Sequence, residues 1–92
     1  MAVTFSAPAT SAWVETVSGA NYARVGIQYD SRPVFVFIGT NAPPDDTQDY
    51  MILGRDNAPE MVVDLSTEEK VFIRSSNKQA MTVGVRGYRE VR

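Results

Sequence analysis

Hydrophobic and polar side chains alternate with a period of two along most of this chain. In residues 22–29, Val25 and Ile27 point to one face while Arg24 and Gln28 point to the other. This alternation is typical of a β-strand that has one face toward a core and one toward solvent. Similar patterns recur at 50–53, 61–65, 71–74 and 81–86, and we expect the last strand to extend to Val91.

The segment Val34–Ile38 departs from this pattern because it is apolar on both faces, with Phe35 and Phe37 alternating with aliphatic residues. Such a strand is either central and covered on both sides, or half exposed at a surface that meets a partner. A turn at 30–33, where Asp, Ser and Pro favour a reversal, precedes it, and a long polar loop at 39–49 follows it.

The N-terminal part of the chain contains two shorter strand signals. In residues 12–18, regular alternation places Trp13, Glu15 and Val17 on the face opposite Val14 and Thr16. Residues 1–11 contain Val3–Phe5 as a strand-like stretch. We therefore expect residues 1–11 to form either an N-terminal arm or an edge strand.

No segment shows a sustained helical stripe of apolar residues. Residues 66–69 match a helix capping box, but β-branched and aromatic residues begin at Val71, so we interpret this stretch as a turn. Polar residues at 75–78 predict a further turn. The pattern thus predicts an all-β fold, a single small antiparallel β-sandwich or barrel of six to seven strands over residues 12–92, with an extended N-terminal arm.

The composition limits the chemistry that this fold can carry. A chain of 92 residues supports one domain with one thin core. It contains no Cys and no His, so it lacks disulfides, thiol nucleophiles and the commonest general base and metal ligand. Carboxylate pairs remain, but short strands leave little room for a substrate cleft. We therefore expect no enzyme activity and no cofactor.

Two features bear on location. Residues 1–6 lack the charged region and apolar run of a signal peptide, and the longest run of bulky apolar residues, Val34–Ile38, is far shorter than the roughly 20 residues that span a bilayer as a helix. The absence of Cys fits a reducing cytoplasm. We expect no membrane partner.

Charge is distributed unevenly although the net charge is only −2. Residues 45–69 carry eight carboxylates and one arginine, whereas residues 70–92 carry six basic side chains and one glutamate. Such a chain can neutralise itself within the fold, or copies of it can join head to tail. Arg86, Tyr88, Arg89 and Arg92 could suggest nucleic-acid binding, but the acidic pI of about 4.9 argues against it, and we expect no nucleic-acid partner.

The longest loop carries three neighbouring carboxylates, those of Asp45, Asp46 and Asp49. Clustered carboxylates can hold Ca²⁺, but this spacing fits no calcium loop and lacks the glycine that a sharp turn needs. A solvated acidic loop is the simpler interpretation, and a loop that meets a basic partner is compatible with it. We expect no metal site.

Aromatic residues offer a further alternative. Trp13, Tyr22, Tyr29, Phe35, Phe37 and Tyr50 are either core residues or parts of a platform on which sugar rings stack. Core packing is the simpler interpretation for the phenylalanines. Trp13 and exposed tyrosines support the alternative of a carbohydrate-binding module.

Several stretches carry a resemblance to a known family. They are Pro33–Gly39 (PVFVFIG), Pro43 in the next loop, Glu69–Ser75 (EKVFIRS) and the Val-alternating Met81–Val85. Together they resemble the small β-sandwich proteins of tailed bacteriophage virions, over about two-thirds of the chain. Met1–Gly19 lies outside the resemblance.

The resemblance implies a non-enzymatic virion structural protein, a head decoration or cementing subunit that binds the major capsid protein or another virion protein and forms a dimer or trimer. Such a protein is assembled in the host cytoplasm and located in the virion. A neck, tail or fibre component is the alternative within this class. We expect the contacts at Asp45, Asp46, Asp49, Arg86, Tyr88, Arg89, Arg92 and Trp13.

Overall fold

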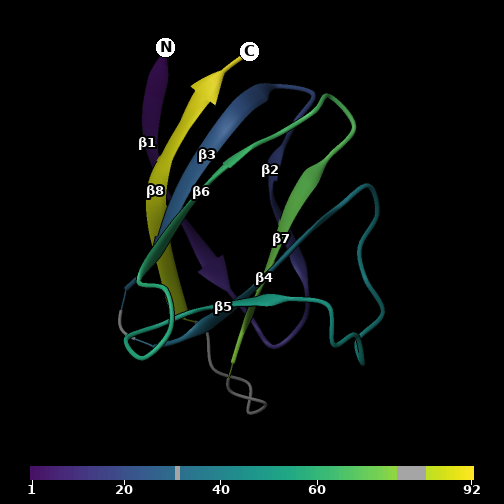
Figure 1. Ribbon diagram of the computed structural model, residues 1–92, viewed down its shortest axis with the longest axis vertical. Coiled ribbons are helices and arrows are strands. Elements are labelled where there is room, and N and C mark those ends of the chain that lie inside the picture. Colours follow the sequence, from purple (N-terminus) through teal and green to yellow (C-terminus); the bar gives the residue numbers. More distant parts are fainter. Residues whose placement is uncertain (31, 77–82) are drawn as a thin grey trace.

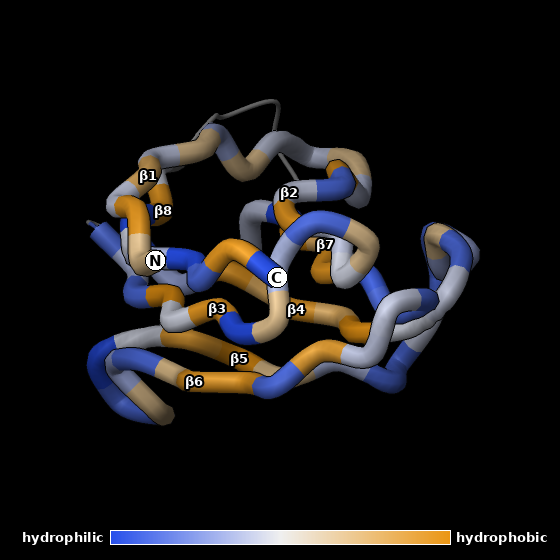
Figure 2. The backbone as a smooth tube through the Cα atoms, turned by 90° about the horizontal axis from the view of Figure 1, so that it is seen from above, coloured by the Kyte–Doolittle hydropathy of each residue, from blue (hydrophilic) through white to orange (hydrophobic). Residues whose placement is uncertain are grey.

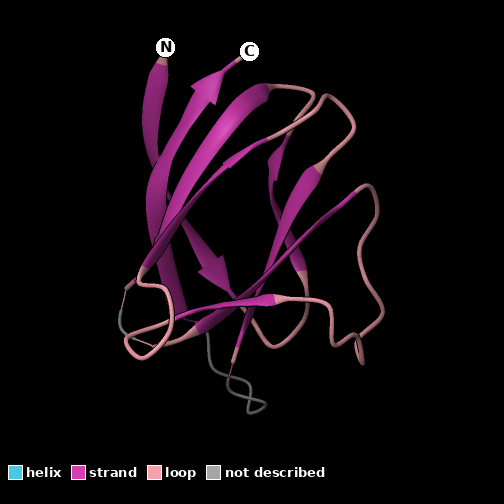
Figure 3. Ribbon diagram, viewed as in Figure 1, coloured by secondary structure: helices cyan, strands magenta, loops and turns pink. Residues whose placement is uncertain are grey.

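The computed structural model describes residues 1–30, 32–76 and 83–92 and contains eight strands and, over those residues, no helix (Figures 1 and 3). The strands are β1 (Ala2–Ala9), β2 (Val14–Ser18), β3 (Tyr22–Tyr29), β4 (Val34–Gly39), β5 (Met51–Leu53), β6 (Glu60–Asp64), β7 (Lys70–Ser75) and β8 (Val83–Val91). The all-β prediction is confirmed. The predicted count of six to seven strands is wrong by at least one, because the N-terminal segment adds β1.

The strands form two four-stranded antiparallel sheets that pack as a small β-sandwich. Sheet A has the order β1-β8-β3-β6, and sheet B has the order β2-β7-β4-β5. Seen from above, hydrophobic residues of β3, β4 and β7 come together in the middle of the molecule (Figure 2). Every strand therefore has one face toward the other sheet and one outer face.

The core lies between the sheets and consists mainly of aliphatic side chains. Val25 and Ile27 of β3 face Val36 of β4 and Ile73 of β7, and all four are buried. These residues occupy alternate positions of their strands, so the period of two identified them correctly. The whole buried cluster comprises Ala9, Val17, Val25, Ile27, Val34, Val36, Leu53, Leu65, Val71, Ile73 and Val85.

Strand β4 is central in sheet B, between β7 and β5. Val34 and Val36 are buried in the core, whereas Phe35 and Phe37 lie on the outer face and are half-buried. The strand is therefore central, as the first alternative predicted, but its outer face is only half covered rather than covered fully.

Strand β2 corrects the predicted alternation of residues 12–18. Val14 pairs with Ile73 and Val17 pairs with Val71, and the register shifts between Glu15 and Val17. The shift is a β-bulge, which inserts one extra residue and brings Val14 and Val17 onto the same, core-facing side. Strict alternation had placed them on opposite faces.

The two ends of the chain pair with each other. Strand β1 pairs with β8 over its whole length, so residues 2–9 form an edge strand rather than a free arm. Strand β8 lies between β1 and β3, and the basic C-terminal segment is therefore an interior strand of sheet A.

The predicted turn at 66–69 is confirmed. The Ser66 N–H donates to the Glu69 carboxylate at 2.8 Å, and no helix follows within the described chain. The predicted turns at 30–33 and 75–78 and the start of the predicted strand at 81–86 lie partly outside the described residues.

Candidate functional site

The outer face of sheet B carries a continuous cluster of five aromatic rings. Phe35 stacks on Tyr50 with ring centroids 4.2 Å apart. Trp13 lies 6.1 Å from both Tyr50 and Phe37, and Phe37 lies 6.3 Å from Phe72. Phe72 is 4 % exposed although it does not belong to the core between the sheets. We call Trp13, Phe35, Phe37, Tyr50 and Phe72 the aromatic cluster.

Arg74 is held within this cluster. Its guanidinium carbon lies 5.0 Å from the centre of the Trp13 ring and 5.4 Å from that of Phe35, within the range of cation–π attraction. One terminal nitrogen donates a hydrogen bond to the backbone carbonyl of Asp45 at 2.9 Å. Among the ion pairs of the described residues, none involves Arg74. The side chain is thus fixed in place with its charge not paired to a carboxylate.

An open cavity of about 630 Å³ lies at this edge of the cluster. Its walls include Phe35 and Tyr50, the Arg74 side chain, and the β4–β5 loop at Asp45, Asp46 and Gln48. That loop runs along the side of the sandwich (Figure 1). The cavity volume is within the range of small-molecule sites. The lining combines apolar rings with hydrogen-bond donors and hydrogen-bond acceptors.

The outer face of sheet A has a different character, since three of the four ion pairs of the described residues lie on it, whereas sheet B carries one, between Lys70 and Glu15 at 3.7 Å. Arg24 of β3 donates to Asp64 of β6 at 2.7 Å and lies 3.8 Å from Glu90 of β8. These contacts raise the pKa of Arg24, first through the hydrogen bond to Asp64. Arg86 forms an ion pair with Asp30. All of these side chains are substantially exposed, so solvent screens their attraction.

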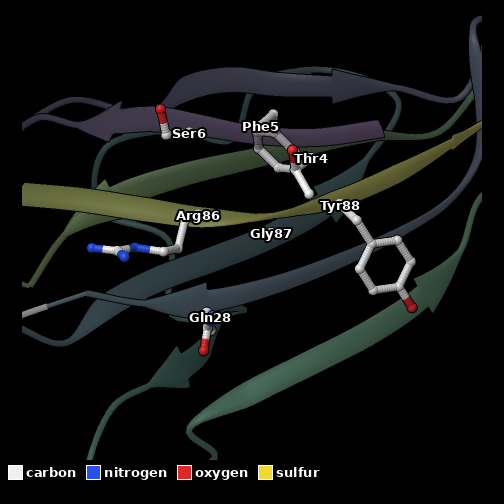
Figure 4. A pocket seen from close by; sticks show the side chains of 7 residues that line it. All are labelled: Thr4, Phe5, Ser6, Gln28, Arg86, Gly87 and Tyr88. Atoms are coloured by element: carbon white, nitrogen blue, oxygen red, sulfur yellow. The ribbon is translucent and has the colours of Figure 1, made fainter. Parts of the chain in front are cut away.

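Tyr88 lies over a glycine on this face. A Cβ atom at Gly26 would lie 2.4 Å from a carbon of the Tyr88 ring, so only a glycine leaves room for the ring there. Beside it is a shallow depression of about 590 Å³ (Figure 4). Figure 4 shows the side chains of Arg86 and Tyr88 pointing away from each other, so these two residues do not converge on one ligand.

The four predicted basic-segment contacts do not form one surface. Arg86 and Tyr88 lie on the outer face of sheet A, whereas the Arg89 guanidinium lies 4.5 Å from the Tyr22 ring and 5.0 Å from the Phe5 ring. Arg92 donates from Nε to the Gly19 carbonyl at 2.7 Å and from a terminal nitrogen to that of Leu65. The last two arginines therefore stabilise the fold at the chain ends.

The predicted acidic contacts lie next to the aromatic cluster. Asp45, Asp46 and Asp49 are all exposed, and Asp45 and Asp46 border the cavity. Within the described chain, no group of three or more acidic residues is arranged to hold a metal ion. Trp13, also predicted, lies in the cluster.

Sequence reasoning missed Arg74 and Phe72 as part of this surface. Both sit at outward positions of β7, in register with Phe35 and Phe37 of β4. One signal in the sequence could have indicated them. Residues 34–38 are apolar on both faces, so the face turned away from the core needs other side chains to cover it.

The four edge strands of the two sheets differ in how they are protected. Strand β5 has three residues, β2 contains the bulge and Glu15, and β6 begins with Glu60 and ends with Asp64. Short length, bulges and charges all discourage a further strand from pairing. Strand β1 has eight residues and no charged side chain, with Pro8 near its end, and Val3 is 41 % exposed.

No protein-family model, curated protein or solved structure matches this chain. The resemblance to virion proteins therefore stays a prediction. The part of the chain that the structure describes contains no helix that could span a lipid bilayer.

Proposed function

We propose that this protein is a structural subunit of a tailed-phage virion, a non-enzymatic head decoration or cementing subunit that binds the major capsid protein. The observation that carries the proposal is the long, uncharged edge strand β1. Its outward backbone N–H and C=O groups can pair with an extended segment of a neighbouring subunit, which would add a strand to sheet A.

The contrast with the other edges supports this use of β1. Natural β-proteins protect exposed edges because an unpaired edge is a site of association. Three edges of this sandwich carry such protection and β1 does not, apart from Pro8, which removes one backbone donor. The segment Ala2–Ala7 is therefore the surface at which pairing with another protein is least opposed.

Size and setting fit the same role. A sandwich of 92 residues buries a modest core and offers little area to a single partner. On a particle that displays many copies at fixed spacing, weak contacts add up through avidity. Exposed acidic groups at Asp45 and Asp46 can orient the subunit against a basic neighbour without contributing much affinity.

Quantitative mass spectrometry of purified particles tests the proposal. A head subunit is expected at on the order of hundreds of copies per particle, whereas a tail or neck component forms a ring of about six or twelve. Particles that lack the chain altogether would overturn the proposal.

A pair of matched variants tests the role of β1. Thr4→Lys places a charge on the outer face of β1, and Val62→Lys places one on β6, at the other edge of sheet A. Both positions are exposed, so both variants should fold. We expect Thr4→Lys to reduce the copy number in particles at least about tenfold, because a charged edge resists pairing, while Val62→Lys leaves it unchanged. Equal incorporation of the two variants would exclude β1 as the contact.

A further inference from the structure

The cavity beside the aromatic cluster lies away from the proposed assembly strand, since it opens on sheet B while β1 belongs to sheet A; it shares with the proposed assembly only the acidic groups of Asp45 and Asp46. Two observations distinguish it from an ordinary surface hollow. Arg74 is held at its rim by a hydrogen bond to the Asp45 carbonyl and by the Trp13 ring, without a carboxylate partner among the described ion pairs, and Tyr50, which lines it, is half-buried and stacked on Phe35. Both groups are placed before any ligand arrives, which reduces the entropy cost of binding.

The charges around the cavity restrict the ligand. Asp45 and Asp46 would repel an anion, and the Arg74 guanidinium would repel a cation. A neutral ligand with many hydroxyl groups avoids both penalties. Hydroxyls donate to the two carboxylates and accept from Arg74, and Gln48 can do either.

The aromatic rings of the cavity wall provide a surface for the apolar part of such a ligand. Phe35 and Tyr50 stack on each other at 4.2 Å and together present apolar surface at the cavity wall. A pyranose ring has an apolar C–H face and an edge of hydroxyls, so it can contact the rings while its hydroxyls reach the polar side chains.

We propose that this cavity is a binding site for a neutral saccharide, with Tyr50 as the contact for the sugar face and Asp46 and Arg74 as its hydrogen-bonding partners. Asp45 has a double role in this proposal, because its backbone carbonyl accepts a hydrogen bond from Arg74 while its exposed carboxylate borders the cavity. The site does not depend on the proposed virion role and can be tested on the isolated chain.

The experiment begins with a glycan array of defined neutral, sialylated and sulfated saccharides, probed with the purified protein. The best neutral saccharide is then titrated while the fluorescence of Trp13 is followed. Trp13 is the only tryptophan, and it lies 6.1 Å from Tyr50 and 5.0 Å from the Arg74 guanidinium, so the signal reports on this site.

Matched variants assign the binding to the cavity. Asp46→Asn and Tyr50→Ala should each weaken binding at least about tenfold, because the first replaces a charged acceptor with a weaker neutral one and the second removes the ring that contacts the sugar. Asp56→Asn and Tyr88→Ala change the same residue types away from the cavity and should leave binding unchanged. Melting temperatures of all four proteins separate loss of the site from loss of the fold.

Each result decides the proposal. Binding of a neutral saccharide that is lost in the cavity variants and kept in their controls supports it. No array signal above background, equal binding by Asp46→Asn and wild type, or binding restricted to sulfated glycans and abolished by salt would overturn it. None of these results bears on whether β1 mediates assembly.

Discussion

The two outer faces of the sandwich differ in the residues that predominate on them. The outer face of sheet A carries exposed ion pairs, such as Arg24 with Asp64, and a tyrosine lying over a glycine. The outer face of sheet B carries the aromatic cluster, in which Phe72 is 4 % exposed. The outer face of sheet A is therefore in contact with solvent, whereas the outer face of sheet B carries a second, smaller apolar layer.

This difference indicates how stability is distributed. Strands with one buried face alternate between apolar and polar residues, whereas strands covered on both faces do not. In sheet B, β4 and β7 contribute Val36 and Ile73 to the core and Phe37 and Phe72 to the aromatic cluster. We infer that the outer face of sheet B contributes more to the stability of the molecule than the outer face of sheet A does.

Truncating one ring on each outer face tests this inference directly. Phe72→Ala should destabilise the protein by about 3–5 kcal/mol, the usual cost of removing a buried phenylalanine ring. Tyr88→Ala should cost about 1 kcal/mol, because its ring lies on an exposed face above Gly26. Urea denaturation followed by circular dichroism measures both.

The outcome that would contradict the inference is a similar cost for the two variants. That result would mean that the Phe72 ring is not shielded from solvent, and that the aromatic cluster does not act as a second apolar layer. A second check is the m-value, which should be unchanged if both variants keep the same denatured state.

The alternation of apolar and polar residues that predicted the strands also predicted which residues form the core. Val25, Ile27, Val36 and Ile73 all occupy positions that a regular period of two assigns to one face. The bulge in β2 escaped this reasoning, because one extra residue changes the face of everything that follows it and leaves no mark in composition. Local pattern thus predicts strands well and their irregularities poorly.

The candidate site was predicted only in part. Trp13, Asp45 and Asp46 were singled out, but their proximity depends on how the β4–β5 loop lies beside sheet B. Arg89 was expected at a surface, whereas it packs against Phe5 and Tyr22. Arg89 lies on the same face of β8 as the buried Val85. Charged side chains usually face solvent, so the sequence pattern did not predict an arginine on this face.

Two arginines on the opposite outer faces provide a more sensitive comparison. Arg74→Met removes attraction to two rings and a hydrogen bond to the Asp45 carbonyl, and we expect a cost of about 1–2 kcal/mol. Arg86→Met removes an exposed ion pair with Asp30, and we expect about 0–1 kcal/mol. Methionine keeps most of the aliphatic stem, so the comparison isolates the guanidinium.

Urea denaturation at low and high salt measures these costs. The effect of Arg74→Met should persist at high salt, because the aromatic rings shield part of the guanidinium from the ions in solution. The effect of Arg86→Met should decrease, because salt screens its exposed ion pair. If Arg86→Met cost more than Arg74→Met under both conditions, ion pairs on sheet A would matter more than the aromatic cluster, and the comparison would be reversed.

Arg24→Gln should have the weakest effect, although Arg24 joins β3 to both β6 and β8 through Asp64 and Glu90. Its raised pKa, caused first by the hydrogen bond to Asp64, contributes stability that is complete below the unfolded-state pKa and is lost only as the pH rises above it. Arginine stays protonated far into the alkaline range. The melting-temperature difference between Arg24→Gln and wild type should therefore be the same at about pH 6 and about pH 9, and should shrink between about 0.05 and 0.5 M NaCl. A difference that vanished at pH 9, or grew with salt, would show that Arg24 acts through packing or another titrating group rather than through its exposed ion pairs.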